Sequence, residues 1–91
     1  MDDSAIIDLY FARSEKAIQE TGVKYGNYLH TIAGNILHTQ EDSEEAVNDT
    51  YLAAWNAMPP TRPRVLRHFL SRIVRNLSFK RYSYLTADKR S

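Results

Sequence analysis

The chain has 91 residues, of which 43% are hydrophobic and 25% are charged, a composition typical of one small globular domain. Because it contains no cysteine, it can form neither a disulfide framework nor a thiolate metal site. No apolar run approaches the ~20 residues of a membrane span, and the acidic start Met1-Asp2-Asp3 is unlike a secretory signal. We therefore expect an intracellular domain without a membrane partner.

The formal net charge of +1 conceals an uneven distribution of charge along the chain. Residues 1–56 contain ten acids and three bases, a net charge of −7, whereas residues 57–91 contain nine bases and one acid, a net charge of +8. Such asymmetry indicates a polyanionic partner for the C-terminal part and a different partner for the acidic part. The pattern leaves open a simpler alternative, in which the two halves attract each other.

Two N-terminal helices are predicted by apolar residues that recur at i, i+3 and i+4. The first covers about residues 3–20 and ends at Gly22, a residue type that commonly terminates helices. The second covers about residues 23–38 and contains Gly26 and Gly34. Glycine weakens a helix but lets another helix approach closely, so both positions are candidate packing sites.

Two further helices follow, with clear start and stop signals. The third begins at Asp42, where Asp42 would cap the helix and Glu45 would reach back in an acidic variant of the capping box. It ends before the paired prolines at residues 59–60, which remove backbone donors and favour extended backbone. The fourth covers about residues 63–82 and starts with Pro63, a favourable first helical residue.

No segment alternates apolar and polar residues in the manner of a strand. The predicted fold is therefore all-α, a compact bundle of four helices. Residues 1–85 are expected to form this single domain, and residues 86–91 to begin a linker.

The polar side of the fourth predicted helix is rich in arginine, whose guanidinium group binds phosphates and guanine edges through two parallel hydrogen bonds. Three aromatic residues, Phe79, Tyr82 and Tyr84, are interleaved and could stack on unpaired bases. This pattern indicates contact with nucleic acid. A solvated basic face is the alternative that the pattern leaves open.

The polar side of the third predicted helix is acidic, and such a stripe is by itself typical of solvated surface. One apolar residue, Leu52, lies among the polar ones, and this is a feature of protein interfaces. The stripe consists of Glu41, Glu45, Asn48, Asp49, Leu52 and Asn56.

The sequence offers no candidate for a catalytic or metal site. The histidines at positions 30, 38 and 68 are scattered and lack the spacing of metal ligands. A Gly-rich phosphate loop and a G-x-S-x-G nucleophile motif are both missing from the sequence. We therefore expect a non-enzymatic protein without a cofactor or metal.

Two segments resemble motifs of one protein family. Residues 42–55, DSEEAVNDTYLAAW, resemble the core-binding helix of bacterial sigma factors of the sigma-70 family, which in the extracytoplasmic-function type reads roughly DAEDLVQETFLRAW. Residues 69–77, FLSRIVRNL, resemble the family's W-L-x-x-I-A-R-N-L segment. The order and spacing of the two motifs also fit. The resemblance covers residues 23–82 well and residues 1–22 more loosely, and it concerns region 2 alone.

The resemblance implies a promoter-specificity subunit of transcription initiation in the bacterial cytoplasm. The third helix would bind the clamp helices of the β′ subunit of core RNA polymerase. The following loop and the fourth helix would recognise and melt the −10 promoter element, and the family holds flipped non-template bases in protein pockets. An anti-sigma factor is a further conceivable partner, and a C-terminal domain for the −35 element would follow the linker.

The same resemblance assigns roles to individual residues. Those implied to bind polymerase are Glu45, Asn48, Asp49 and Leu52. Those implied to contact DNA are Arg62, Arg64, Arg67, Arg72, Arg75, Asn76, Lys80 and Arg81.

Two other functions remain as alternatives. A helical protein–protein interaction module would show no preference for the non-template strand of the −10 element. A general basic-helix DNA-binding domain would prefer duplex DNA and would not bind polymerase.

Overall fold

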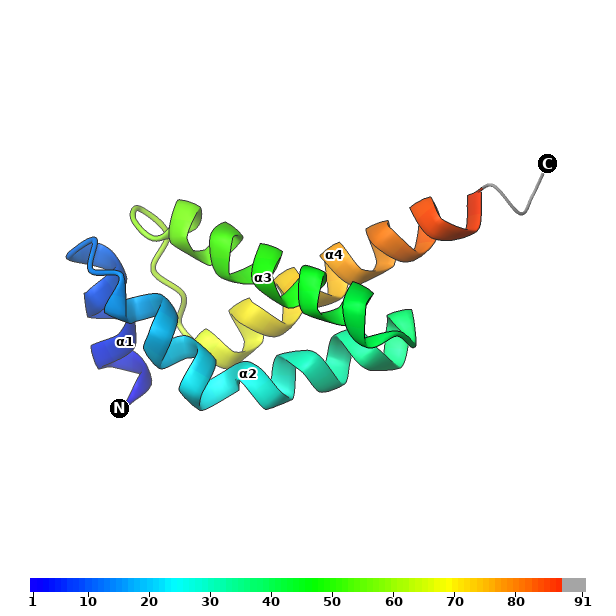
Figure 1. Ribbon diagram of the computed structural model, residues 1–91. Coiled ribbons are helices and arrows are strands. Elements are labelled where there is room, and N and C mark those ends of the chain that lie inside the picture. The colour runs from blue at the N-terminus through cyan, green and yellow to red at the C-terminus, as the bar shows by residue number, and fades with distance from the viewer. Residues whose placement is uncertain (88–91) are drawn as a thin grey trace.

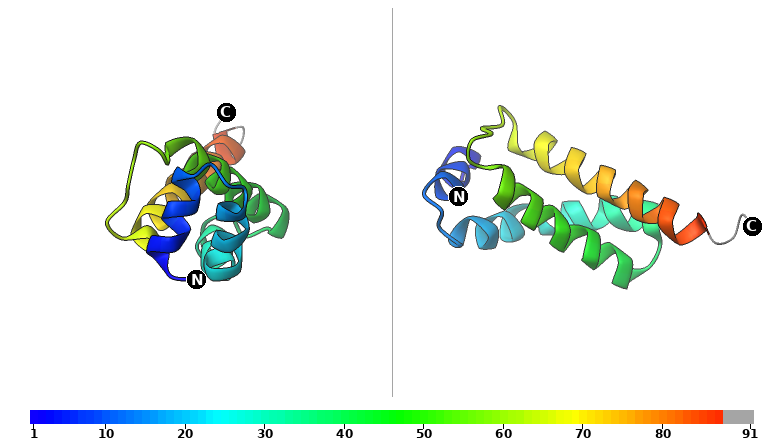
Figure 2. Two further views of the ribbon diagram at one scale, coloured as in Figure 1. Left: turned by 90° about the vertical axis from the view of Figure 1, so that its left-hand side faces the viewer. Right: turned by 90° about the horizontal axis from the view of Figure 1, so that it is seen from above.

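The computed structural model describes residues 1–87, and residues 88–91, on which most of the expected linker falls, lie outside the described part. Within residues 1–87 the chain forms four helices and no strand, which confirms the predicted all-α bundle (Figure 1). The helices are α1 (Asp3–Phe11), α2 (Lys16–Leu37), α3 (Gln40–Ala57) and α4 (Leu66–Ala87). Helix α2 packs against both α3 and α4, while the short α1 closes one end of the bundle (Figure 2). None of these helices is long and apolar enough to cross a membrane.

The core lies between the apolar sides of α2, α3 and α4, as the helical periodicity predicts. Leu29, Val47, Leu70 and Val74 are completely buried there. Burial of each such side chain contributes about 1.5–3 kcal/mol, so this apolar contact dominates the stability of the bundle. From α1, the buried Tyr10 reaches into the core, and its hydroxyl lies 2.7 Å from the hydroxyl of Thr21 on α2.

The predicted first helix over residues 3–20 is wrong, because α1 ends at Phe11 and the chain turns before α2 starts at Lys16. Arg13 has a φ of 55° in this turn, a left-handed conformation that no helix can continue through. The turn allows the Arg13 side chain to reach the C-terminal end of α3, where it donates hydrogen bonds to backbone carbonyls. A contact so distant in the chain leaves no local sequence signal.

The prediction that a helix ends at Gly22 is also wrong, because α2 passes through this residue without a break. A Cβ atom at Gly22 would lie 3.5 Å from the hydroxyl oxygen of Tyr51 on α3, and one at Gly26 would lie 3.4 Å from it. Both glycines therefore lie against the end of the Tyr51 side chain at ordinary van der Waals distances, and the close helix approach predicted for Gly26 stays a prediction.

Helix α3 begins one turn earlier than predicted, with Thr39 rather than Asp42 as its N-cap. Thr39 is extended, and its hydroxyl accepts a hydrogen bond from the Asp42 N–H and donates one to the Asp42 carboxylate. Asp42 thus occupies the third helical position, and Glu45 does not reach back to it. A threonine followed three residues later by an acid satisfies the same capping rule, so the sequence contains two competing start signals.

Residues 58–65 form the loop between α3 and α4, and α4 starts at Leu66 rather than at Pro63 as predicted. Leu66 is the first residue of this region after Met58 that the core buries, which fixes where the helix begins. At its other end α4 continues through Thr86 and Ala87, beyond the predicted end at Tyr82. Its last turns extend past the rest of the bundle (Figure 2).

Candidate functional site

The exposed side of α3 carries all the residues expected to bind polymerase. Glu45, Asn48, Asp49 and Leu52 are exposed, and Leu52 has 57% of its surface accessible to solvent. They share one side of the helix, and the residues at the intervening positions are buried or partly buried against the core. We call these four residues the acidic face. An exposed leucine flanked by carboxylates suits a partner that presents basic groups around an apolar spot.

The outer side of α4 carries Arg72, Arg75, Asn76 and Lys80, all of them exposed. We call these four residues the basic face. Phe79 lies among them with 53% of its surface exposed. Within residues 1–87 none of the three cations forms an ion pair, so their charges are available to an anion.

A pocket of about 400 Å³ opens beside the basic face, where the 58–65 loop joins α4. Three apolar side chains and two guanidinium groups line it together with one histidine: Pro63, Val65, Phe69, Arg64, Arg72 and His68. Apolar walls can cover a flat ring and the cations can bind a phosphate, so the lining suits a nucleotide unit. We call this cavity the loop pocket.

The other three expected DNA contacts engage other parts of the protein. Arg62, in the 58–65 loop, forms an ion pair with Asp8 on α1 at 2.9 Å. Arg67 lies over the ring of Tyr28 on α2, with its guanidinium carbon 4.6 Å from the ring centre. Arg81 points from α4 toward α3 and does not share the outer side of the helix.

Arg81 joins α4 to the N-terminal part of α3. Its guanidinium group lies 2.7 Å from the Asp42 carboxylate and 2.9 Å from that of Glu45. The Thr39 hydroxyl and the Arg81 guanidinium, in that order of importance, hold the pKa of Asp42 below its ordinary value. The hydrogen bond to Asp42 in turn raises the pKa of Arg81. One member of the acidic face, Glu45, is therefore already paired within the domain.

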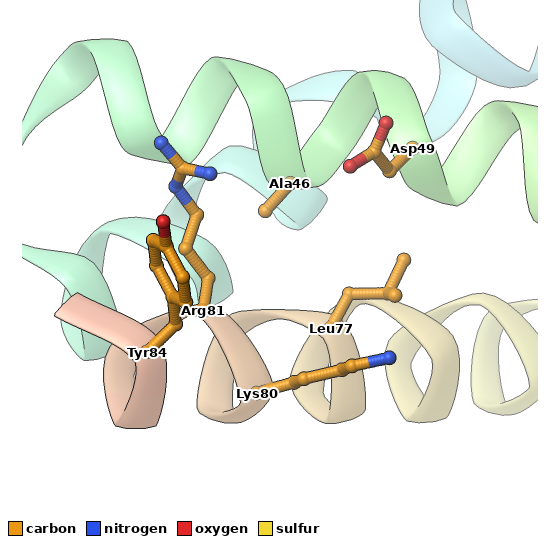
Figure 3. A pocket seen from close by; sticks show the side chains of 6 residues that line it. All are labelled: Ala46, Asp49, Leu77, Lys80, Arg81 and Tyr84. Atoms are coloured by element: carbon orange, nitrogen blue, oxygen red, sulfur yellow. The ribbon is translucent and has the colours of Figure 1, made fainter. Parts of the chain in front are cut away.

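A second cavity, of about 280 Å³, lies between α3 and α4 (Figure 3). Ala46 and Leu77 supply its apolar walls, while Asp49 belongs to the acidic face and Lys80 to the basic face. Arg81 reaches up from α4 toward α3, whereas Lys80 extends along its own helix (Figure 3). The cavity thus separates the two charged faces.

Two long-range contacts made by the N-terminal part of the chain were not predicted. Asp8 pairs with Arg62, and Arg13 stacks on Trp55 with its guanidinium carbon 3.7 Å from the ring centre. The partners are 54 and 42 residues apart. Local periodicity carries no information about pairs at such separations.

A metal site is not indicated, because within residues 1–87 no three acidic or histidine side chains gather in a suitable arrangement.

Comparison with known proteins decides the family. A sequence model described as sigma-70 region 2 matches residues 23–87, well over half of the chain. The chain belongs to the sigma-70 region 2 family. Members of this family act in transcription initiation and interact with core RNA polymerase and promoter DNA. No curated protein and no solved structure was found to match the chain. The match begins inside α2, so α1 and the turn after it lie outside the matched region.

Proposed function

We propose that this sigma-70 region 2 domain is of the extracytoplasmic-function type and holds polymerase and promoter DNA on two different helices. The acidic face of α3 binds the clamp helices of the β′ subunit. The basic face of α4, with the 58–65 loop, binds the non-template strand of the −10 element. The observation that supports this most strongly is the exposure of both faces on neighbouring helices, with opposite charge and a cavity between them.

On the polymerase side, Asp49 is the central residue. Glu45 forms an ion pair with Arg81, whereas within residues 1–87 Asp49 forms no ion pair. Asp49 is thus available to a basic group of the β′ clamp helices, Asn48 can hydrogen-bond there, and Leu52 adds apolar contact. Electrostatic complementarity of this kind speeds association and excludes wrong partners.

On the DNA side, the loop pocket accommodates a base that has left the duplex. Extracting a base costs a few kcal/mol of stacking energy, which contacts with the protein must offset. Phe69 and Val65 supply apolar surface for the ring, and Arg64 and Arg72 supply phosphate contacts. The exposed Phe79 offers a second stacking surface along the basic face.

Calorimetric titration of the domain with an isolated β′ clamp-helix fragment at low salt tests the polymerase contact. We expect saturable binding that Asp49→Ala weakens by about 2 kcal/mol, or about 30-fold in Kd, because a desolvated charge pair is lost. The matched control is Glu44→Ala, which removes an exposed acid of the same helix outside the acidic face.

Binding that both variants retain would contradict the role of Asp49. Absence of binding by the folded wild-type domain would contradict the proposal as a whole and would favour a DNA-binding or other interaction module.

A further inference from the structure

Helix α1 lies beside the 58–65 loop, the segment that leads into the basic face (Figure 2). Two arginines connect them, one from each side. Arg62 extends from the loop to α1, and Arg13 extends from the turn after α1 to the start of the loop. The α1 segment lies outside the residues that match the family model, whereas the loop lies inside them.

Arg13 provides a fixed anchor. Its guanidinium group stacks on the Trp55 ring and donates hydrogen bonds to the carbonyl oxygens of Trp55 and Met58, at 2.8 and 2.6 Å. Carbonyls at the C-terminal end of a helix lack partners within the helix and attract cations. The anchor therefore ties the α1–α2 turn to the point where the loop begins.

Arg62 is held much more loosely. It donates to the Asp8 carboxylate at 2.9 Å, and its guanidinium carbon lies 5.2 Å from the centre of the Phe11 ring. The side chains of Arg62 and Asp8 are 48% and 65% exposed. Exposed ion pairs contribute only about 0.2–1 kcal/mol, so this pair can be exchanged at little cost.

A carboxylate and a phosphate present similar oxygen pairs to a guanidinium group. We propose that Asp8 binds the Arg62 guanidinium group in the free domain and competes with a DNA phosphate for that group. This inference rests on the proposed DNA binding. Bound DNA takes Arg62 away from α1, while the Arg13 anchor keeps the start of the loop in place.

The test is a double-mutant cycle with Asp8→Asn and Arg62→Ala. The probe is a short fluorescent single-stranded DNA of random sequence, and the readout is its affinity by anisotropy at low salt. We expect Asp8→Asn to tighten binding about 1.5- to 5-fold, the equivalent of releasing one exposed ion pair. A merely structural role for Asp8 would weaken binding instead.

Removing any negative charge also favours DNA binding. Two comparisons separate this general effect from the specific release of Arg62. Glu41→Gln removes an exposed acid at the start of α3, remote from the loop, and should tighten binding less than Asp8→Asn. In the Arg62→Ala background, Asp8→Asn should have no more effect than Glu41→Gln, because no side chain remains for which Asp8 competes. Circular dichroism confirms that each variant is folded.

The outcomes distinguish the inference from the function on which it rests. Suppose that wild type binds the DNA and that Arg72→Ala weakens this binding. If Asp8→Asn then changes the affinity no more than Glu41→Gln does, or changes it equally in the Arg62→Ala background, the competition is refuted and the DNA interface stands. If folded wild type does not bind the DNA, both are refuted.

Discussion

Asp42 illustrates how one residue can serve a different purpose from the one its sequence context predicts. Asp42 is the third residue of α3. One of its carboxylate oxygens accepts a hydrogen bond from the Thr39 hydroxyl, and the other accepts one from the Arg81 guanidinium group. Each hydrogen bond stabilises the charged carboxylate, which is why its pKa lies below the ordinary value of 3.8. Asp42 therefore stabilises the folded state in its ionised form.

This linkage predicts a specific loss of stability in acid. Because the pKa of Asp42 is lowered by folding, its stabilisation is complete above the unfolded-state pKa and is lost as the pH falls through the folded-state pKa. Asp42→Asn should be less stable than wild type at about pH 6, and the two should converge toward about pH 2. Thermal unfolding followed by circular dichroism measures both curves. A constant difference across this range would contradict the role of the ionised carboxylate.

The exposure of single site residues was predictable in some cases and not in others. Asp49 and Leu52 are exposed because they lie opposite the apolar positions of their helix, which the periodicity shows directly. The ion pairs that Arg62 and Arg81 each form with carboxylates could not be foreseen. Their carboxylate partners lie 54 and 39 residues earlier in the chain, and only the packing of the helices brings them together.

At the scale of elements, α4 divides its positive charge between two environments. Successive residues of an α-helix are about 100° apart, so neighbours in sequence can face different surroundings. Lys80 is exposed on the outer side, whereas Arg81 is half-buried against α3. The resemblance assigns both to DNA, but their contacts in the free domain differ.

Lys80→Ala and Arg81→Ala form a matched pair that tests this division. Lys80→Ala should weaken binding to single-stranded DNA and reduce the salt slope by about 0.7, the value for one lost phosphate contact, with little change in Tm. Arg81→Ala should lower Tm more than Lys80→Ala does, because Asp42 and Glu45 both lose their partner, and should leave the salt slope closer to that of wild type. Salt-dependent anisotropy titrations and thermal unfolding give the two readouts. Equal salt slopes for the two variants would contradict the division.

The boundaries of the helices, too, could be predicted only in part from the local sequence. The periodicity of residues 3–20 continues through the turn at Arg13, so the sequence predicts one helix where the structure has a break. The break depends on the contacts of Arg13 with α3, which no local pattern encodes. Within α2 the opposite holds, because Gly22 predicts a helix end where the structure has a continuous helix.

At the scale of the whole molecule, part of the uneven charge is neutralised within the domain. Ion pairs join the acidic part to the basic part, from Asp8 to Arg62 and from Asp42 and Glu45 to Arg81. The halves therefore do attract each other. The remaining charges on the acidic and basic faces stay exposed on separate helices, where two partners can approach.

If the two faces act separately, their variants should show separate effects. Asp49→Ala should leave affinity for single-stranded DNA within about twofold of wild type, while Arg72→Ala should lower that affinity and leave binding of the β′ clamp-helix fragment unchanged. Distant substitutions without shared contacts usually act independently. Both variants are titrated with both ligands under one buffer condition. A folded variant with lower affinity for both ligands would show that the faces are coupled.

The sequence by itself determined that this chain is an all-α domain of the sigma-70 region 2 family. Amphipathic periodicity and contiguous motifs are local properties, so they can be recognised without coordinates. Only the tertiary structure decided which charged side chains remain available to partners. An arginine is free or paired according to which carboxylate the packed helices bring within about 3 Å, and burial of the apolar core brings these distant segments together.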